Sequence, residues 1–249
     1  MKIAVCVNHV PDTEMKVKIG PDGRTIDRAG VNFIINPYDE FAVEAALRLK
    51  EKFGGETVVV SLGGDANKEA MRKALAMGID RAVFLKDESV RDSYSVAFAL
   101  AAELKTVSAD FVFFGKQSID YSDEQIPGLV AEFLGWPSVS SAVGLEVEAS
   151  GKVTCEREIE GGRETIETKF PVVISAQKGL NEPRYPALRN VMTAKTKPME
   201  EKQPAAMAPK VEVLAMKKPP AKAPGRIIGS DAASAKELVR LLREEAKVF

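Results

Sequence analysis

The sequence predicts an α/β protein with an open, mostly parallel sheet, flanking helices, a small antiparallel β addition and a C-terminal extended arm with a helix. Three observations predict it. In the first half, short apolar runs alternate with segments of helical period, which is typical of parallel strands and crossover helices. Residues 145–168 alternate apolar and polar side chains around glycine turns, which favours antiparallel strands. Residues 197–225 are rich in Pro, Ala and Lys and lack a sustained period.

The first half supplies the parallel sheet. We expect strands at residues 3–7, 57–62, 82–85 and 111–114, and helices at residues 41–52, 68–77 and 95–107. Gly20-Pro-Asp-Gly23 separates two short apolar stretches and predicts a projecting hairpin. Asn36, Pro37 and Asp39 are typical of a helix start, with an N-cap, a proline and an acidic first turn. Asp65 is expected to cap the next helix in the same way.

The polar stretch after residues 111–114 is the best candidate for a nucleotide pocket. It runs from Gly115 to Ile126 and precedes a helix-like segment, which is where an open α/β sheet builds a ligand site. Gly115 permits close approach, Gln117 and Ser118 offer hydrogen-bonding groups, and the following helix favours an anion at its N-terminus. From this segment alone, an ordinary polar loop is an equal alternative.

The second half adds antiparallel strands, a returning strand and the arm. We expect the antiparallel strands at residues 145–149, 153–159 and 165–168, and a buried strand at residues 170–175. A closing helix at residues 234–247 has one apolar stripe. The chain thus divides into an α/β nucleotide-binding domain, residues 1–196, and an arm with a helix, residues 197–249. The helix packs on its own domain or on another chain, and the second is favoured.

Composition excludes several classes of protein. The 249 residues include 35 basic and 36 acidic side chains, so no overall field favours nucleic acid or a charged membrane surface. No apolar run approaches the roughly 18 residues of a membrane span, and we read the chain as a cytoplasmic protein without a targeting segment. The two cysteines, Cys6 and Cys155, lie far apart and are expected to be small packed residues.

The motifs of common catalytic sites are missing from the sequence. It contains no G-x-S-x-G, no P-loop and no G-x-G-x-x-G after the first strand. His9 is the only histidine, and we expect it to be solvated in a loop. Acidic pairs such as Asp120 and Asp123 are expected to be solvated as well. The sequence predicts no catalytic and no metal-ligating residues, so any redox group is brought by a cofactor.

Several separated segments together resemble the beta (small) subunit of electron transfer flavoprotein. They cover nearly the whole chain in order, and they are Val5-Cys-Val-Asn-His-Val-Pro-Asp-Thr13, Asn36-Pro-Tyr-Asp-Glu-Phe-Ala-Val-Glu44, Gly115-Lys-Gln-Ser-Ile-Asp120 with Gln125, Arg157-Glu-Ile-Glu-Gly-Gly-Arg-Glu-Thr-Ile166 with Pro171-Val-Val-Ile-Ser175, and Leu180-Asn-Glu-Pro-Arg-Tyr185 with Leu188, Asn190 and Met192.

The resemblance implies a Rossmann-like sheet of the adenine nucleotide alpha hydrolase type in a heterodimeric electron carrier. A larger alpha subunit holds most of the FAD site, and residues 197–249 pack on that subunit. The resemblance also implies that this subunit binds a structural AMP. It implies acyl-CoA-type flavin dehydrogenases as electron donors and a membrane quinone oxidoreductase as the acceptor.

The resemblance also implies the site residues. Those that contact AMP would be Cys6, Asn36, Pro37, Tyr38, Asp39, Leu62, Gly115, Lys116, Gln117, Ser118, Ile119, Asp120, Ser122, Asp123, Glu124, Gln125 and Ile126, with Tyr38 nearest the flavin. The segment that docks partner dehydrogenases would be residues 184–193, with Arg184, Tyr185, Leu188, Asn190 and Met192, and Leu188 as its apolar anchor.

Departures from the family pattern keep alternatives open. The loop reads Asp120-Tyr-Ser-Asp-Glu-Gln125, unlike the usual AMP binders and unlike the bifurcating members, which hold a second FAD in place of AMP. Asn8 and His9 stand where many relatives have basic residues, and Thr193 and Thr196 where some have lysine. A bifurcating subunit with a second FAD is one alternative. A second is a stand-alone adenine-nucleotide-binding module. A third is an ATP-pyrophosphatase-like enzyme, but such enzymes need a Ser-Gly-Gly loop after the first strand, and this chain has residues 8–12, Asn-His-Val-Pro-Asp, there.

Overall fold

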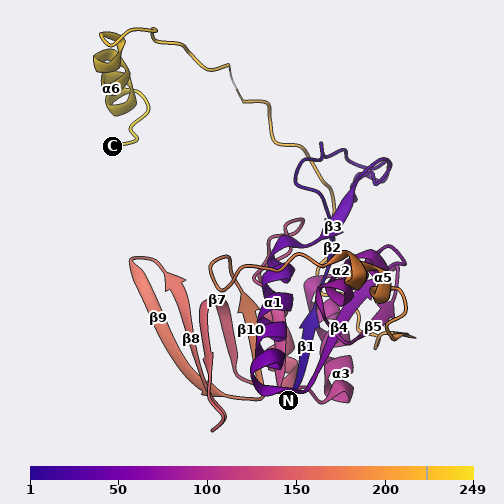
Figure 1. Cartoon of the computed structure of the whole chain (residues 1–249). Coiled ribbons are helices and arrows are strands. Elements are labelled where there is room, and N and C mark those ends of the chain that lie inside the picture. The colour runs from indigo at the N-terminus through magenta and orange to yellow at the C-terminus, as the bar shows by residue number, and fades with distance from the viewer. Residues whose placement is uncertain (223) are drawn as a thin grey trace. The chain divides into compact units, whose positions relative to one another are not determined.

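A computed structural model describes residues 1–222 and 224–249 of the chain. Contacts divide the protein into two units, residues 1–214 and residues 215–249, and each is described by itself (Figure 1). The first unit contains the large sheet and its flanking helices, and it ends at residue 214. The second contains the terminal helix.

A nine-stranded sheet forms the centre of the first unit, and its order is β11-β5-β4-β1-β6-β10-β7-β8-β9. Its middle strands are parallel, and they are β5 (Arg81–Lys86), β4 (Glu56–Gly63), β1 (Lys2–Cys6), β6 (Phe111–Gly115) and β10 (Val172–Ala176). The predicted strands and their parallel direction are confirmed. The chain builds outward from β1 through β4 to β5, then returns to place β6 on the other side of β1. This reversal creates a topological switch point between β1 and β6.

Helices cover the two faces of the parallel strands. On one face, α1 (Pro37–Phe53) and α2 (Asn67–Met77) pack over a core that includes Ile3 and Val5. On the other face, α3 (Ser93–Val107) and α4 (Ile126–Leu134) pack over a core that includes Ala4 and Cys6. Because successive side chains of a strand point to opposite faces, the continuous apolar run of β1 contributes side chains to both cores.

The antiparallel addition is also confirmed. It consists of β7 (Ser138–Val147), β8 (Lys152–Ile159) and β9 (Gly162–Lys169), joined in sequence by tight turns (Figure 1). β7 also pairs in parallel with β10, so this addition continues the main sheet. Cys155 is fully buried in β8 as a packed residue, as expected.

Four short elements lie where the sequence shows no clear period. β2 (His9–Pro11) and β3 (Phe33–Ile35) form a small antiparallel sheet at the base of the predicted hairpin, whose stretches are joined by an isolated bridge between Ile19 and Ile26. α5 (Leu188–Ala194) lies against α2. β11 (Met199–Lys202) pairs in parallel with β5 inside the predicted arm, because β5 would otherwise present an open edge.

The second unit contains α6 (Ser234–Glu244), which confirms the predicted terminal helix. Arg240 is paired with Glu237 and Glu244 on its surface. Leu241 is buried, whereas Leu238 and Val239 on the helix remain exposed. Among the helices of the described residues, none is long and apolar enough to cross a membrane.

Candidate functional site

The carboxyl ends of three neighbouring strands bring together residues that are far apart in the sequence. β1 ends at Cys6, and its neighbours β4 and β6 end beside it at Gly63 and Gly115. Cys6 and Leu62 therefore stand at the same sheet edge as the start of the loop at residues 115–126. This edge is the switch point, where open α/β sheets bind their ligands.

Asn36 holds the predicted nucleotide loop in place. Its amide Nδ2 donates to the carbonyl of Gln117 at 2.9 Å, and its Oδ1 accepts from the backbone N–H of Ile119 at 3.3 Å. The residue is almost fully buried and occupies the N-cap position of α1, but its side chain makes no capping hydrogen bond. The predicted side-chain cap is wrong, because the amide is used across the switch point.

Asp39, in the first turn of α1, binds both the loop after β6 and the segment that follows β1. Its carboxylate accepts from Asn8 N at 2.7 Å, from Asn36 Nδ2 at 2.8 Å and from Gly115 N at 3.1 Å. Burial raises the pKa of Asp39 from 3.8 to about 7, although these hydrogen bonds favour the charged form. Asn36 and Asp39 thus connect the end of β1, the start of α1 and the loop after β6.

Gly115 is required by the close approach of α1. A Cβ at this position would lie 2.3 Å from Asp39 Oδ1 and 2.7 Å from Tyr38 Cβ. The element that comes close to Gly115 is the first turn of this helix, which includes half-buried Pro37 and Tyr38. Any larger residue would push the loop away from α1.

The rest of the loop is polar and partly bound to its neighbours. Lys116 Nζ lies 3.2 Å from Glu124 Oε1, and Asp123 is hydrogen-bonded to Ser93 at the start of α3. Ser122 N donates to Ser118 O at 2.8 Å, which closes a turn within the loop. The exposed residues are Asp120, Tyr121, Ser122, Glu124 and Gln125, and Ile126 is half-buried at the first position of α4. The loop therefore offers amide, hydroxyl and carboxylate groups to a ligand.

Asp65 does not cap α2. Its carboxylate binds Lys68 Nζ at 2.7 Å and Lys86 Nζ at 2.8 Å, and these hydrogen bonds lower its pKa to about 2. The cap prediction is wrong because Lys86, from β5, lies next to this turn. Two lysines compete with the helix N–H groups for one carboxylate.

His9 is buried, and the prediction of a solvated loop histidine is wrong. It lies in β2, and its ring stacks on Phe33 with 5.2 Å between ring centroids. Its Nε2 lies 4.0 Å from Glu69 and has no hydrogen-bond partner among the described residues. Burial lowers the pKa of the ring. The pairing of β2 with β3 at the base of the predicted hairpin removes this side chain from water. The turn at residues 20–23 indicated the hairpin, but it did not indicate that the base of the hairpin would bury His9.

The predicted docking segment presents apolar side chains to solvent. Leu188 is 80% exposed and Tyr185 97% exposed, and Met192 and Asn190 are exposed beside them. Residues 188–194 are the helix α5, so the expected loop is half helical. Arg184 differs from the others because its guanidinium is bound to Glu44 and Glu51 of α1.

Sequence reasoning missed Glu44. This glutamate is 3% exposed, and it accepts from Arg48 Nε at 2.8 Å and from Arg184 Nε at 2.7 Å. Its only local signal is the i, i+4 spacing to Arg48, which is common on solvated helix faces. The contact with Arg184 spans 140 residues, so only the fold supplies it.

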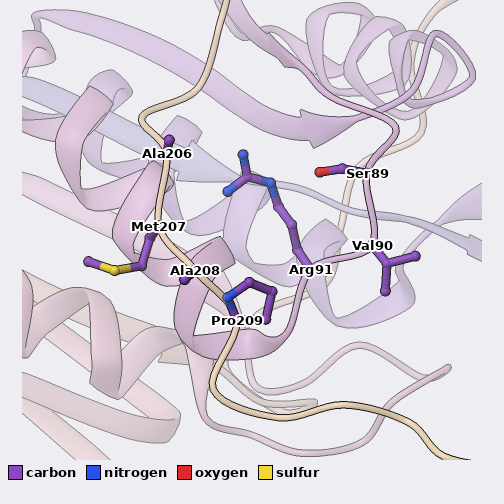
Figure 2. Close-up of a pocket in the computed structure, with 7 residues that line it drawn as sticks. All are labelled: Ser89, Val90, Arg91, Ala206, Met207, Ala208 and Pro209. Atoms are coloured by element: carbon purple, nitrogen blue, oxygen red, sulfur yellow. The ribbon is translucent and has the colours of Figure 1, made fainter.

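Two hollows among the described residues are lined by other segments of the chain. One, of about 380 Å³, separates residues 89–91 from residues 206–209 (Figure 2). Arg91 extends toward the 206–209 segment, and its Nε donates to Asp87 at 2.6 Å. The other, of about 420 Å³, lies in the projecting segment at residues 12–32. Neither hollow is lined by a residue predicted to bind the nucleotide, so those contacts stay a prediction.

Known proteins resemble this chain over its full length. The family model described as "Electron transfer flavoprotein domain" matches residues 23–207. The "Electron transfer flavoprotein subunit beta" of Syntrophomonas wolfei is 42% identical over 250 residues, covering 100% of this chain and 98% of the relative. Proteins of the same name from Bacillus subtilis and Homo sapiens are 39% and 36% identical, each covering 100% of this chain and 100% and 99% of the relative.

Proposed function

The chain belongs to the family of electron transfer flavoprotein beta subunits, and from that premise we propose that it is the AMP-holding half of a heterodimeric electron carrier. A beta subunit implies an alpha subunit as its partner. The alpha subunit holds most of the FAD site. Within the predicted arm, residues 197–249, β11 pairs with β5 of this chain's own sheet, so the part that packs on the alpha subunit is residues 215–249. FAD supplies the redox chemistry when bound, and this chain performs no bond chemistry itself.

One observation carries the assignment of the adenylate. Cys6, Leu62 and the loop at residues 115–126 converge on the switch-point edge, and Asn36 and Asp39 fix that loop with hydrogen bonds. The exposed loop groups fit AMP, because carboxylates can accept from ribose hydroxyls and the N-terminus of α4 favours a phosphate. Buried Asn36 and Asp39 act by holding this loop in place.

The nucleotide content of the purified heterodimer tests this assignment. We expect one FAD and one AMP per heterodimer when the protein is denatured and the released nucleotides are identified by mass spectrometry. Two FAD and no AMP would replace the proposal with the bifurcating alternative. A flavin-loaded homo-oligomer of this chain alone would contradict both, because the FAD site needs the alpha subunit.

The docking segment, residues 184–193, is proposed to receive acyl-CoA-type flavin dehydrogenases, and the electrons then pass to a membrane quinone oxidoreductase. An exposed leucine beside a tyrosine and a methionine is the kind of apolar anchor that protein interfaces use. Tyr185, Leu188 and Met192 form this exposed group in the free subunit.

Substituting Leu188 by alanine tests the docking role. We expect L188A to raise the KM for the dehydrogenase by about tenfold or more, since an interface hot spot contributes about 2 kcal/mol. FAD content and melting temperature should stay unchanged, because the side chain is 80% exposed. V90A is the matched control, since Val90 is 81% exposed in the loop between β5 and α3. Equal KM values in L188A and the wild type would remove the docking role.

A further inference from the structure

Glu44 is the centre of a charge cluster that joins α1 to the segment carrying Leu188. Arg184 makes three hydrogen bonds to this carboxylate, from its backbone N at 3.2 Å, from Nε at 2.7 Å and from a terminal nitrogen at 3.0 Å. Arg48 binds the same carboxylate from α1. Burial opposes the charge, but the two arginines outweigh it and leave the pKa of Glu44 below its usual range. A charge-assisted, two-pronged contact of this kind fixes both position and orientation.

Neighbouring contacts fasten the same short segment to the same helix. Asn181 Nδ2 donates to Phe41 O at 2.9 Å, and Arg184 also reaches Glu51 at 2.5 Å. Residues 181–184 are therefore bound to α1 along more than two turns. Residues 185–187 contain a proline and lead directly into Leu188, so little freedom separates the fastened segment from the exposed anchor.

The start of α1 holds the nucleotide loop through Asn36 and Asp39, and Asp39 lies only five residues before Glu44. Five residues correspond to about 7.5 Å along a helix axis. One rigid helix thus holds the nucleotide loop at its N-terminal end and the docking segment further along.

We propose that Glu44 is a positioning residue for partner docking, which through Arg184 sets the direction in which Leu188 and α5 are presented to the dehydrogenase. This inference rests on the proposed docking role of Leu188. It assigns no contact between Glu44 itself and the partner, because Glu44 is buried under Arg184. The contact between Glu44 and Arg184 raises the fraction of molecules in which the docking segment has the correct orientation.

The test is a double-mutant cycle in the assembled heterodimer. E44Q keeps the size of the side chain and removes its charge. We expect E44Q to raise the KM for the dehydrogenase by about fivefold to tenfold, the coupling expected of residues that act together, with the limiting rate and FAD content unchanged. In the L188A background, E44Q should add little. E51Q is the matched control, since it removes the exposed partner of the same arginine, and a small effect is expected.

Hydrogen exchange gives a second readout that does not depend on the dehydrogenase. The amides of residues 181–187 should exchange faster in E44Q and stay as in the wild type in E51Q. If E44Q does not fold, R184K replaces it, because lysine keeps the charge but cannot make the two-pronged contact. A wild-type KM in E44Q beside a raised KM in L188A overturns the positioning role alone. Effects that multiply fully in E44Q/L188A overturn it as well, whereas a silent L188A overturns the docking role itself.

Discussion

Asn36 and Asp39 illustrate how residues with ordinary helix-start chemistry can be used for a different purpose. Both have side chains that cap helices well in isolation. In the folded protein both turn toward the loop after β6, and their hydrogen bonds reach Gln117, Ile119 and Gly115. The helix start then lacks a side-chain cap, and the loop gains a fixed shape instead.

Substituting Asp39 by asparagine should destabilise the protein. The carboxylate accepts three hydrogen bonds, whereas an amide turns an N–H₂ group toward some of these donors. We expect a loss of about 1–3 kcal/mol in the free energy of unfolding at pH 8, measured by urea denaturation. E40Q, at the next position of α1, removes a surface ion pair to Lys73 and should cost less than about 1 kcal/mol.

The pH dependence of the free energy of unfolding, compared between D39N and the wild type, tests whether Asp39 titrates near neutrality. With a folded-state pKa of about 7 against 3.8 unfolded, the folded protein holds a proton that the unfolded chain lacks between these values. The contribution of Asp39 to stability therefore rises as pH falls from 7 to 4. His9, whose pKa is lowered, acts in the opposite direction, but it does so in both proteins. Parallel stability curves for D39N and the wild type across this range would contradict the assignment.

At the scale of elements, the segments with a clear hydrophobic period formed as predicted, whereas the sequence pattern did not predict several short or polar elements. β11 is one example, because Met199-Glu-Glu-Lys202 has no strand pattern. It forms because β5 offers an edge and because Lys202 and Glu201 pair with Glu103 and Lys68. Lys197, just before it, donates to two carbonyls at the end of α2.

Asp92 joins two elements, and its substitution should release one of them. One carboxylate oxygen caps α3 by accepting from Ser95 N, and the other accepts from Lys210 N at 2.6 Å and Val211 N at 2.9 Å. D92N keeps a good cap but turns its amide N–H₂ group toward those two donors. We expect tryptic cleavage after Lys210 to become severalfold faster, with α3 intact.

The control for this substitution is E212Q. Glu212 lies next to residues 210–211, and E212Q removes its exposed ion pair with Arg24 of the projecting hairpin. Its cleavage rate should stay close to that of the wild type, since exposed pairs contribute little. Equal cleavage of D92N and the wild type would show that Asp92 does not fasten residues 210–211.

At the scale of the whole molecule, topology decides where function can reside. The strand order places β1 between β4 and β6, so three strand ends from distant parts of the sequence form one edge. Helix α1 crosses between that edge and the docking segment. Family membership, shown by relatives that match the whole chain, gives this arrangement its proposed use in electron transfer.

The sequence by itself determined the alternation of strands and helices, the antiparallel addition, the terminal helix and the position of the candidate loop, because periodicity and turn residues act over short distances. Only the tertiary structure decided the partners of the polar side chains. Asn36 binds a loop 81 residues away and Glu44 an arginine 140 residues away. A buried polar group must satisfy its hydrogen bonds with whatever the fold places beside it, and local sequence holds no record of that neighbour.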